Sequence, residues 1–565
     1  MIVLKFGGSV LLDEQRLRIA VHEIYRWRRD GWRVIAVVSA LAGRTEDLIA
    51  KCALSFANPS DQSKASLIAS GELESASLLG VHLDRAGIPA VVLSPASIQL
   101  VAEGDPLDST PVKINRSKID KALSIEGVVI IPGFTAINES GSTVTLGRGG
   151  SDLTAVFLAH NLQADRCRLI KDIDGLYESD PVRNSLTPPR RFGYASYLDA
   201  MQTDGTIIQH KAVQYAESND LEFELGRFNG LRPTRIGSGL TIYTDSPDRS
   251  EILDIAICGL GTVGRGVLEL IEQLPDLFSI SGAACKTPSK HTDLRGIADC
   301  ISDNADLVAG SGARIVLELI GGTETAHHVV KKALDSQSHV ITANKALIAQ
   351  RHDEFHERAH EQEVTIRYSA SVGGVAPVIE AIESRSPEKT PVCSVRGVLN
   401  GTGNFVLGAL ETGVGLEETI KEAQLQGFAE ADPSRDLDGY DSLDKLLVVA
   451  HRLGWSVNSK QAEVESISDW VSNTDQSRFP VRHIATLNKQ GASVLIEAVD
   501  PSDEFGILKD EWNAAVIEFG DGSIQVVKGK GAGKWPTSES VFADLLELSR
   551  EITLANAERE TTYVS

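Results

Sequence analysis

Residues 147–152 read Gly-Arg-Gly-Gly-Ser-Asp and stand directly before residues 153–162, a run with the composition of a helix. Glycines let the backbone approach a ligand closely, and a helix N-terminus offers free N–H groups and partial positive charge to an anion. Arg148 adds a planar fork that matches a carboxylate or a phosphate, and Ser151 or Asp152 can cap the helix. The hexapeptide therefore predicts an anion-binding site, with a glycine hairpin and a surface arginine as the plain alternative.

A second phosphate-type signal lies at the start of the chain, where an apolar run over residues 2–6 ends in Lys5, Phe6, Gly7 and Gly8. This order can place an ammonium group and free backbone N–H groups against phosphate oxygens. It is not a Walker A loop, because GK[ST] is absent. Strand–Gly–Gly turns without a ligand are equally common.

A third signal is the sequence GLGTVG at residues 259–264, between an apolar run at 252–258 and a helical run at 267–274. In this context the pattern is typical of a dinucleotide-binding fold. An NAD site places an acid about 20 residues further on. Here that region carries Cys285 and Lys286, with Lys290 close behind. The missing acid and the added lysines favour the 2′-phosphate of NADP.

A run of carboxylates occupies residues 427–445 and ends in Lys445. A solvated charged face and a calcium loop are the plain alternatives, but the EF-hand spacing is absent. Asp441 and Lys445 are four residues apart, so in a helix they share one face, where the carboxylate can orient the lysine. The acids of the run are Glu430, Asp432, Asp436, Asp438, Asp441 and Asp444.

The candidate residues must be positioned by a regular fold, and the sequence predicts parallel sheets for this role. Apolar runs that lead into glycine turns and helical segments occur in two series, which predicts α/β layers around largely parallel sheets. The runs of the first series are residues 2–6, 34–38, 90–93, 128–131 and 167–170, with a helical pattern over 17–27. The second series begins at 252–258, after a polar stretch at 244–249 that predicts a linker.

Composition narrows the class of protein. A length of 565 residues predicts three or four domains. A net charge of −23 disfavours nucleic acid and anionic membrane surfaces as partners. The six cysteines form no CxxC pair, which predicts reduced thiols. No apolar run reaches the about 18 residues of a membrane span, and the start lacks a signal-peptide pattern. A cytoplasmic enzyme is expected.

Residues 1–244 resemble aspartokinases of the amino acid kinase superfamily. The resemblance is carried by KFGGS at 5–9, Ser39, Ser70-Gly71-Glu72, TLGRGGSDLTA at 145–155 and KDIDGLYESDP at 171–181. It implies an αβα sandwich that transfers the γ-phosphate of ATP, with Mg²⁺, to the β-carboxylate of L-aspartate.

The same resemblance implies a role for each matching residue. Lys5 would stabilise charge on the transferring phosphoryl group, and Asp152 would lie beside the reacting groups. Glu72 would hold the substrate ammonium and Arg148 its α-carboxylate. The remaining expected contacts are Ser9 and Ser39 for the substrate, and Gly7, Gly8, Asp172 and Tyr177 for the nucleotide.

Residues 252–550 resemble homoserine dehydrogenase. The resemblance rests on GLGTVG, TANK at 342–345, VGG at 372–374, NGTGN at 400–404, the acidic run and GKGAGKWPT at 529–537. It implies a Rossmann domain and an α+β substrate and dimerisation domain that reversibly reduce L-aspartate 4-semialdehyde to L-homoserine with NADP(H) in preference to NAD(H). A homodimer or higher homo-oligomer is expected.

In this resemblance Glu430 and Asp436 would grip the substrate ammonium, with Asp441 nearby, and Lys345 and Lys445 would flank the reacting carbonyl. The sequence does not decide which lysine supplies the proton. Groups expected at the dinucleotide are Gly259, Gly261, Thr262, Val263, Gly264, Lys286, Thr342 and Lys345. Backbone carbonyls around Val372 and Val375 are a possible site for Na⁺ or K⁺.

Together the resemblances imply a bifunctional aspartokinase–homoserine dehydrogenase in a short form without ACT regulatory domains. The expected domains are 1–246 (kinase), 250–388 (NADP-binding Rossmann), 389–530 (substrate and dimerisation) and 531–565 (a return to the Rossmann domain).

One alternative is a homoserine dehydrogenase with a degenerate, non-catalytic kinase domain. It is motivated by Lys171 where the family usually has Thr, by Val182 in place of an arginine that here comes one residue later at Arg183, and by Ile207 in place of a phosphate-binding lysine. Lys211 or Lys171 would have to replace that lysine. A second alternative is an NADP sensor without turnover.

Overall fold

The computed structural model describes residues 1–565 apart from 56–58, 182–188, 204, 206, 245–250, 295–300, 386–389, 427–428, 430–431, 474–479, 532 and 565. Residues 245–249 of the predicted linker and the positions Val182, Arg183 and Glu430 therefore lie outside the described residues, whereas Thr244, the first residue of that linker, ends a strand. The chain forms two compact units, one of residues 1–84, 89–250 and 554–565 and one of residues 85–88 and 251–553. Among the described helices, none has the length and apolarity needed to cross a membrane.

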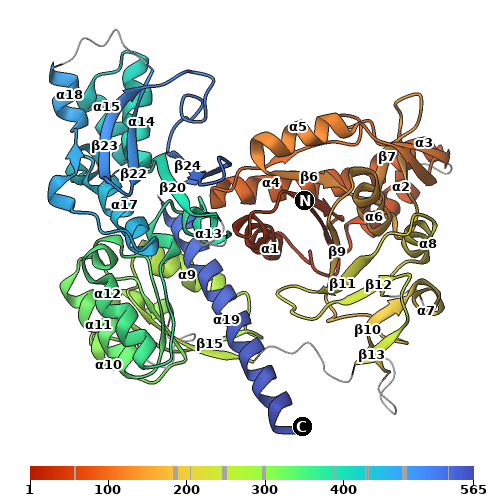
Figure 1. Ribbon diagram of the computed structural model, residues 1–565. Coiled ribbons are helices and arrows are strands. Elements are labelled where there is room, and N and C mark those ends of the chain that lie inside the picture. The colour runs from red at the N-terminus through yellow and green to blue at the C-terminus, as the bar shows by residue number, and fades with distance from the viewer. Residues whose placement is uncertain are drawn as a thin grey trace. The chain divides into compact units, whose positions relative to one another are not determined.

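The first unit is built on a nine-stranded sheet in the order β13-β10-β12-β11-β9-β1-β2-β6-β3 (Figure 1). Its centre is parallel, since β1 pairs with both β2 and β9, and β2 pairs with β6. The central strands are near-continuous runs of Val, Ile and Leu because both faces are buried. The strands of this sheet are β1 (Ile2–Phe6), β2 (Val34–Val38), β3 (Val91–Val92), β6 (Val128–Pro132), β9 (Arg166–Lys171), β10 (Arg191–Ser196), β11 (Phe223–Arg227), β12 (Thr234–Gly237) and β13 (Ile242–Thr244).

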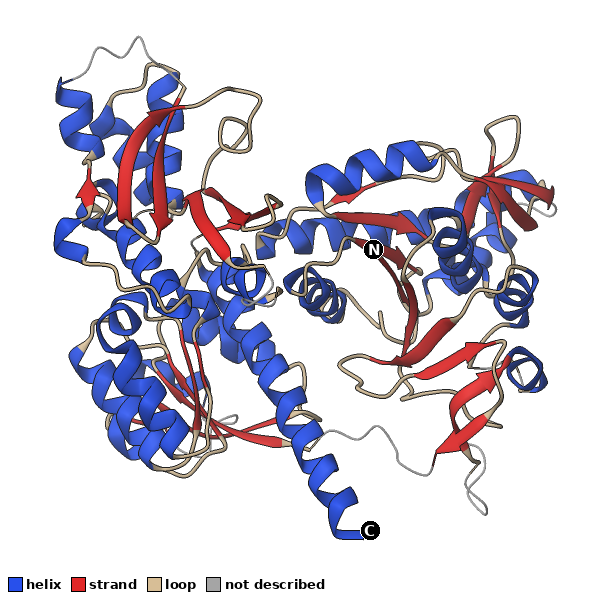
Figure 2. Ribbon diagram, viewed as in Figure 1, coloured by secondary structure: helices blue, strands red, loops and turns tan. Residues whose placement is uncertain are grey.

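Helices cover both faces of this sheet, with α1 and α6 on opposite sides (Figures 1 and 2). A smaller sheet in the order β5-β4-β7-β8 lies in the same unit. Its strands are β4 (Val101–Asp105), β5 (Asp108–Lys113), β7 (Thr135–Ile137) and β8 (Thr143–Thr145). The helices are α1 (Leu17–Arg29), α2 (Arg44–Ser55), α3 (Asp61–Ile68), α4 (Ser70–Ala86), α5 (Arg116–Glu126), α6 (Gly150–Leu162), α7 (Tyr197–Gln202) and α8 (His210–Ser218).

The expectation that Ser151 or Asp152 caps the helix after the glycine loop is wrong. Helix α6 already begins at Gly150, and its N-cap is Gly149 with φ of 78° and no capping side chain. This left-handed conformation suits glycine, so the helix starts earlier and both polar residues fall in its first turn. Neither side chain caps the helix, and both line a cavity of this unit.

The second unit contains an all-parallel six-stranded sheet in the order β16-β15-β14-β17-β18-β19. This is the 3-2-1-4-5-6 order of doubly wound dinucleotide folds. Its strands are β14 (Leu253–Cys258), β15 (Phe278–Ala284), β16 (Ile301–Ser302), β17 (Ile315–Glu318), β18 (His339–Thr342) and β19 (Ile366–Arg367). Its helices are α9 (Thr262–Ile271), η1 (Pro288–Leu294), α10 (Ala305–Ala309), α11 (Glu324–Asp335), α12 (Lys345–Glu361), η2 (Ser369–Ser371) and α13 (Val378–Glu383).

A second six-stranded sheet of this unit, in the order β21-β23-β22-β20-β24-β25, is mostly antiparallel. Its strands are β20 (Val392–Val398), β21 (Glu463–Val464), β22 (Val481–Asn488), β23 (Gly491–Ala498), β24 (Trp512–Phe519) and β25 (Ile524–Lys530). The accompanying helices are α14 (Gly401–Glu411), α15 (Leu416–Leu425), α16 (Ser434–Leu437), α17 (Tyr440–Arg452), η3 (Ser459–Gln461) and α18 (Ile467–Asn473). The predicted α/β fold class, with an α+β part, is confirmed.

The last helix, α19 (Lys534–Val564), contacts strands β15 and β19 of the parallel sheet through Phe542, Glu547 and Glu551. Lys534 pairs with Glu269 on α9 at 2.5 Å, and Ser538 donates to the carbonyl of Val263 at 3.1 Å. Further along, the carboxylate of Asp544 accepts the N–H of Ser369 at 3.1 Å.

Candidate active sites

The first unit holds a cavity of about 490 Å³ at the carboxyl ends of β1, β2 and β9 and the start of α6. The carboxyl edge of a parallel sheet is where such folds bind ligands. Seven residues predicted from the sequence line it together: Lys5, Gly8, Ser9, Ser39, Glu72, Arg148 and Asp152. Three other predicted residues, Gly7, Asp172 and Tyr177, are not among its lining residues.

A buried carboxylate between two ammonium groups lies at the base of this cavity. Asp152 Oδ1 is 2.6 Å from Lys5 Nζ, and Asp152 Oδ2 is 2.8 Å from Lys171 Nζ. Burial opposes the charge on Asp152, but the attraction of Lys171 and Lys5 outweighs it and lowers the pKa to about 2. Burial lowers the pKa of Lys5 to about 8, although Asp152 acts in the opposite direction. The three side chains therefore form a buried cluster with net positive charge, suited to phosphate oxygens.

Glu72 on α4 is a buried carboxyl group whose Oε1 accepts the N–H of Ala40 at 3.4 Å. Its Oε2 is also buried and has no hydrogen-bond partner among the described residues. Burial raises the pKa of Glu72 to about 8. Because an unpaired buried carboxylate oxygen is unfavourable without a cation or donor, this arrangement fits the ammonium group of a ligand.

Arg148 is exposed between two glycines of positive φ, Gly147 at 69° and Gly149 at 78°. Its guanidinium therefore borders the cavity from a tight loop. Lys211 of α8 is ion-paired with Asp108 and also donates to the carbonyl of Leu146 at 3.4 Å, just before that loop.

The positions that differ from the aspartokinase pattern have distinct environments. Ile207 packs against the hydrophobic core of the unit, whereas Lys171 points into the cavity cluster. Tyr177 donates its hydroxyl to Asp174 at 2.9 Å, and Asp172 is exposed. Gln209 and Phe134 also line the cavity, and no sequence signal singled them out.

The second unit contains a comparable cluster on α12 and α17. Asp441 Oδ1 is 2.8 Å from Lys345 Nζ, and Asp441 Oδ2 is 2.7 Å from Lys445 Nζ. Lys445 also donates to the carbonyl of Leu399 at 2.5 Å. The attraction of Asp441 raises the pKa of Lys345. For Asp441 itself, burial is outweighed by Lys445 and Lys345, which hold the pKa of the carboxyl well below its usual range.

Asn400 links this cluster to a second carboxylate. Its amide Nδ2 donates to Asp441 Oδ2 at 2.8 Å and to Asp436 Oδ1 at 2.6 Å. Burial, together with repulsion from Asp441, raises the pKa of Asp436. Because burial makes this carboxyl group costly to ionise, a cationic group of a ligand bound beside it would stabilise its charged form. From the sequence, Asn400 is only a member of the NGTGN motif, because its bridging role depends on a contact 41 residues away.

Three other acids of the run, all among the described residues, have structural partners. Asp432 accepts from the N–H of Ser434 at 3.1 Å, Asp438 accepts from Ser466 at 2.8 Å, and Asp444 pairs with Arg435 at 2.6 Å. The described acids of the run therefore divide into Asp436 and Asp441, which lie near the lysines, and carboxylates that hydrogen-bond or ion-pair with neighbouring segments.

The glycines of residues 259–264 differ in what surrounds them. A Cβ on Gly259 would lie 2.3 Å from the carbonyl of Leu319, and one on Gly264 would lie 1.9 Å from the carbonyl of Gly259. A Cβ on Gly261 would meet no atom of the described part of the chain within 4 Å. The first and third glycines thus permit close strand–helix packing, while the second borders open space. This arrangement fits a pyrophosphate at the start of α9.

Lys286 is exposed two residues after β15, where an acid would hold the ribose of NAD. Thr342 is buried at the end of β18 and donates its hydroxyl to Glu318 at 2.6 Å. Burial raises the pKa of Glu318 to about 7. Val372 and Val375 are buried on either side of Gly373 and Gly374, which both have positive φ.

Residues 259–369 match the family model described as homoserine dehydrogenase, NAD binding domain, and residues 377–546 match the model described as homoserine dehydrogenase. Homoserine dehydrogenase of Pseudomonas aeruginosa is 33% identical over 318 residues, covering 53% of this chain and 73% of that protein. The chain belongs to the homoserine dehydrogenase family. A crystal structure of a homoserine dehydrogenase from Thiobacillus denitrificans is similar with a TM-score of 0.50 at 27% identity, covering 54% of this chain and 75% of that one.

The remainder of this homoserine dehydrogenase family member is a kinase-type domain. Residues 1–223 match the amino acid kinase family. Aspartate kinase of Pseudomonas fluorescens is 28% identical over 254 residues, covering 44% of this chain and 60% of that protein. The pairing of domains predicted for a bifunctional aspartokinase–homoserine dehydrogenase is confirmed.

Proposed function

We propose that the first unit phosphorylates the β-carboxylate of L-aspartate with ATP and that the second reduces L-aspartate 4-semialdehyde to L-homoserine with NADPH. The observation that carries the proposal is the repeated arrangement of one buried aspartate between two lysines, Asp152 in the first unit and Asp441 in the second. Near each cluster lies a carboxyl group that is costly to ionise, Glu72 in the first unit and Asp436 in the second, and such a group suits the ammonium of a small amino acid.

In the kinase reaction, Glu72 would bind the ammonium of aspartate and Arg148 its α-carboxylate. This orientation directs the β-carboxylate toward Lys5 and Asp152, which line the same cavity. Phosphoryl transfer depends mainly on positioning and charge neutralisation. Lys5 and Lys171 supply that charge, and Asp152 holds both ammonium groups in place. ATP with Mg²⁺ supplies the transferred phosphoryl group, with Gly7, Gly8, Asp172 and Tyr177 as the proposed nucleotide contacts.

In the dehydrogenase reaction, Asp436 and Glu430 would bind the substrate ammonium, and Lys345 and Lys445 would flank the carbonyl. Negative charge develops on the carbonyl oxygen as it is reduced, so a nearby ammonium group stabilises it and can supply the proton. Asp441 fixes both lysines, and Asn400 couples it to Asp436. NADPH supplies the hydride when bound at residues 259–264, and Lys286 would favour its 2′-phosphate. A monovalent cation at the carbonyls of Val372 and Val375, and a homodimer or higher homo-oligomer, remain part of the proposal.

The test uses the full-length chain in two assays. With ATP, Mg²⁺, aspartate and hydroxylamine, the chain is expected to form aspartyl hydroxamate; no product above a Lys5→Ala control would favour the degenerate kinase domain. With homoserine and NADP⁺ it is expected to form NADPH; no turnover at any pH tried would favour an NADP sensor.

A further inference from the structure

Three side chains that the proposed reactions do not use converge where α12 contacts α17. His352 and Asp353 come from α12, and His451 comes from the last turn of α17. One potential metal-binding atom from each of the three lies within 4.8 Å of the others. Two imidazoles and a carboxylate form a donor set typical of zinc and related transition metals, whereas Ca²⁺ and Mg²⁺ prefer oxygen.

The spacing of the donor atoms is close to that of a metal site. His352 Nδ1 lies 2.9 Å from Asp353 Oδ1, and His451 Nδ1 lies 3.9 Å from the same oxygen. Around tetrahedral zinc, with bonds of about 2.0–2.2 Å, ligand atoms are about 3.4 Å apart. The two distances lie on either side of this value, and the donor atoms of the three residues all lie within 4.8 Å of one another, so side-chain adjustments would bring them to the spacing of a zinc site.

The second nitrogen of each imidazole is already held. His451 Nε2 lies 3.2 Å from the carbonyl of Ala349, and His352 Nε2 lies 3.2 Å from the hydroxyl of Tyr368. Metal-bound histidines are usually fixed in this way through their other nitrogen. Since a carbonyl only accepts hydrogen bonds, His451 Nε2 carries a proton. In its neutral form, its Nδ1 therefore carries a lone pair, and this atom lies 3.9 Å from the carboxylate oxygen of Asp353, so a cation between the two would be stabilised by both.

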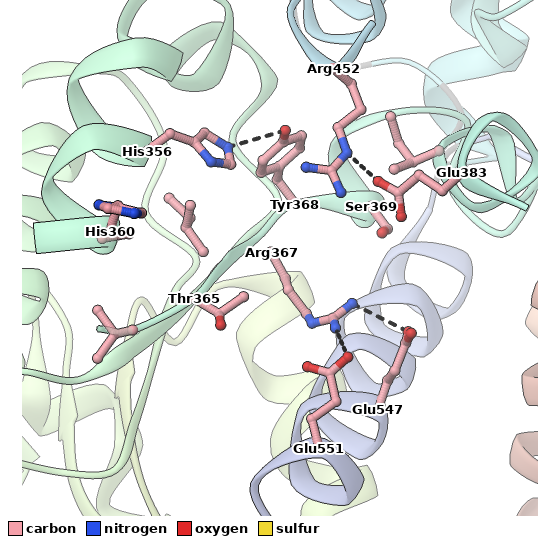
Figure 3. Close-up of a pocket in the computed structure, with 14 residues that line it drawn as sticks. His356, His360, Thr365, Arg367, Tyr368, Ser369, Glu383, Arg452, Glu547 and Glu551 are labelled. Atoms are coloured by element: carbon pink, nitrogen blue, oxygen red, sulfur yellow. Dashed lines mark hydrogen bonds and ion pairs between the residues drawn. The ribbon is translucent and has the colours of Figure 1, made fainter. Parts of the chain in front are cut away.

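The surroundings leave the cluster accessible to a cation. Asp353 is 82% exposed and His451 is 32% exposed, and both line a cavity of about 410 Å³. The nearby positive charge of Arg452 is neutralised by its ion pair with Glu383 (Figure 3). The hydroxyl of Tyr368 is also bonded to His356 Nε2 at 3.3 Å, which holds the hydroxyl in place (Figure 3).

We propose that His352, Asp353 and His451 bind one divalent transition-metal cation of the Zn²⁺ class and so clamp α12 to α17. The position of this metal site matters for the proposed dehydrogenase site, because α12 begins at Lys345 and α17 carries Asp441 and Lys445. Metal binding would hold together the two helices from which the lysine cluster is built. Solvent would complete the coordination on the exposed side.

The test is equilibrium dialysis of the metal-stripped full-length chain against Zn²⁺ alone, with Co²⁺ as a spectroscopic substitute. One Zn²⁺ per chain is expected, and His451→Ala and Asp353→Ala should each weaken binding by at least about tenfold. His360→Ala, an exposed histidine of the same helix, is the matched control and should bind like the wild type. Absence of Zn²⁺ binding by the wild type, or equal affinity in the cluster variants, would overturn the site.

Hydrogen exchange on the same samples tests the clamp separately. Zn²⁺ is expected to slow amide exchange in α12 and α17 of the wild type and of His360→Ala, but not of His451→Ala. Unchanged exchange in the wild type with Zn²⁺ bound would overturn the clamp. Circular dichroism spectra that match the wild type would show that the surface variant Asp353→Ala is folded. Neither readout depends on either enzymatic activity.

Discussion

Asp441 and Lys445 lie one turn apart on α17 and form a 2.7 Å ion pair in which each side chain is only 8% exposed. Removing one partner of such a pair leaves an uncompensated buried charge, which is strongly unfavourable. The pair is not isolated, since Lys345 contacts the other oxygen of Asp441. A buried, shared carboxylate therefore fixes two ammonium groups at one place, as general acid catalysis requires.

Replacement of Lys445 by alanine is expected to lower the dehydrogenase kcat by about 10²–10⁴-fold, the usual contribution of a positioned proton donor. Kinase activity should be unchanged, because Lys445 belongs to the other compact unit. The measurement is homoserine-dependent formation of NADPH by the full chain. Lys421→Ala, an exposed lysine of α15, is the control and should retain full activity. Equal loss of both activities in Lys445→Ala would contradict independent sites.

The affinity for aspartate is expected to rise with pH up to about 8. Burial raises the pKa of Glu72 to about 8, so below that pH the carboxyl must lose a proton before it can bind an ammonium. Apparent affinity should therefore increase up to about tenfold per pH unit and then level off. Calorimetric titration of the full chain with aspartate measures this slope. Glu72→Gln should bind weakly and without the slope; the same slope in that variant would rule out Glu72 as its source.

The stability of the Glu72→Gln variant provides a check on folding. Because the folded pKa of Glu72 lies above the unfolded value of 4.5, this carboxyl destabilises the ligand-free fold progressively as pH rises from about 4.5 to about 8. The glutamine variant lacks this penalty. Its thermal midpoint should equal or exceed that of the wild type above pH 8, while its aspartate binding is impaired.

The kinase is expected to lose activity as pH rises above about 8, because burial lowers the pKa of Lys5 to about 8. An arginine stays protonated throughout this range. In Lys5→Arg the alkaline fall of kcat/KM for ATP, a quantity that reports the free enzyme, should move to higher pH even if the rate itself is lower. An alkaline limb in the same position would show that another group controls it.

Charge reversal at Lys286 is expected to lower kcat/KM for NADPH by about tenfold or more, because Lys286 is proposed to contact the 2′-phosphate, which NADH lacks. The kcat/KM for NADH should change little, so the ratio of the two cofactors is the informative quantity. Lys489→Glu makes the same charge change at an exposed turn and serves as the control. A constant ratio in Lys286→Glu would contradict a role for this lysine in cofactor choice.

Much of the fold could be predicted because its parallel strands are buried on both faces. The run at residues 2–6 coincides with β1, and that at 34–38 with β2, since such strands are uninterrupted apolar segments. The glycine loop before α6 was placed correctly, but its cap was not, because a left-handed glycine took the position expected of a polar side chain.

The sequence predicted which residues belong to the candidate sites better than it predicted the contacts between those residues. Lys5, Glu72 and Asp152 are far apart in sequence. The family motifs assign all three to one site, and all three line one cavity. The pairing of Lys171 with Asp152, and the bridge that Asn400 makes to Asp436, arise from contacts between distant segments. Within the acidic run, sequence alone could not separate the carboxylates that face the lysines from those that stabilise turns.

The central claim is that one chain carries two active sites, each organised by its own buried aspartate–lysine cluster. The most direct test assays both reactions in the full-length wild type, Asp152→Asn and Lys445→Ala. We expect Asp152→Asn to lose aspartyl hydroxamate formation while keeping homoserine-dependent NADP⁺ reduction, and Lys445→Ala to show the reverse. Hydroxamate formation that is no greater in the wild type than in Asp152→Asn would contradict the claim.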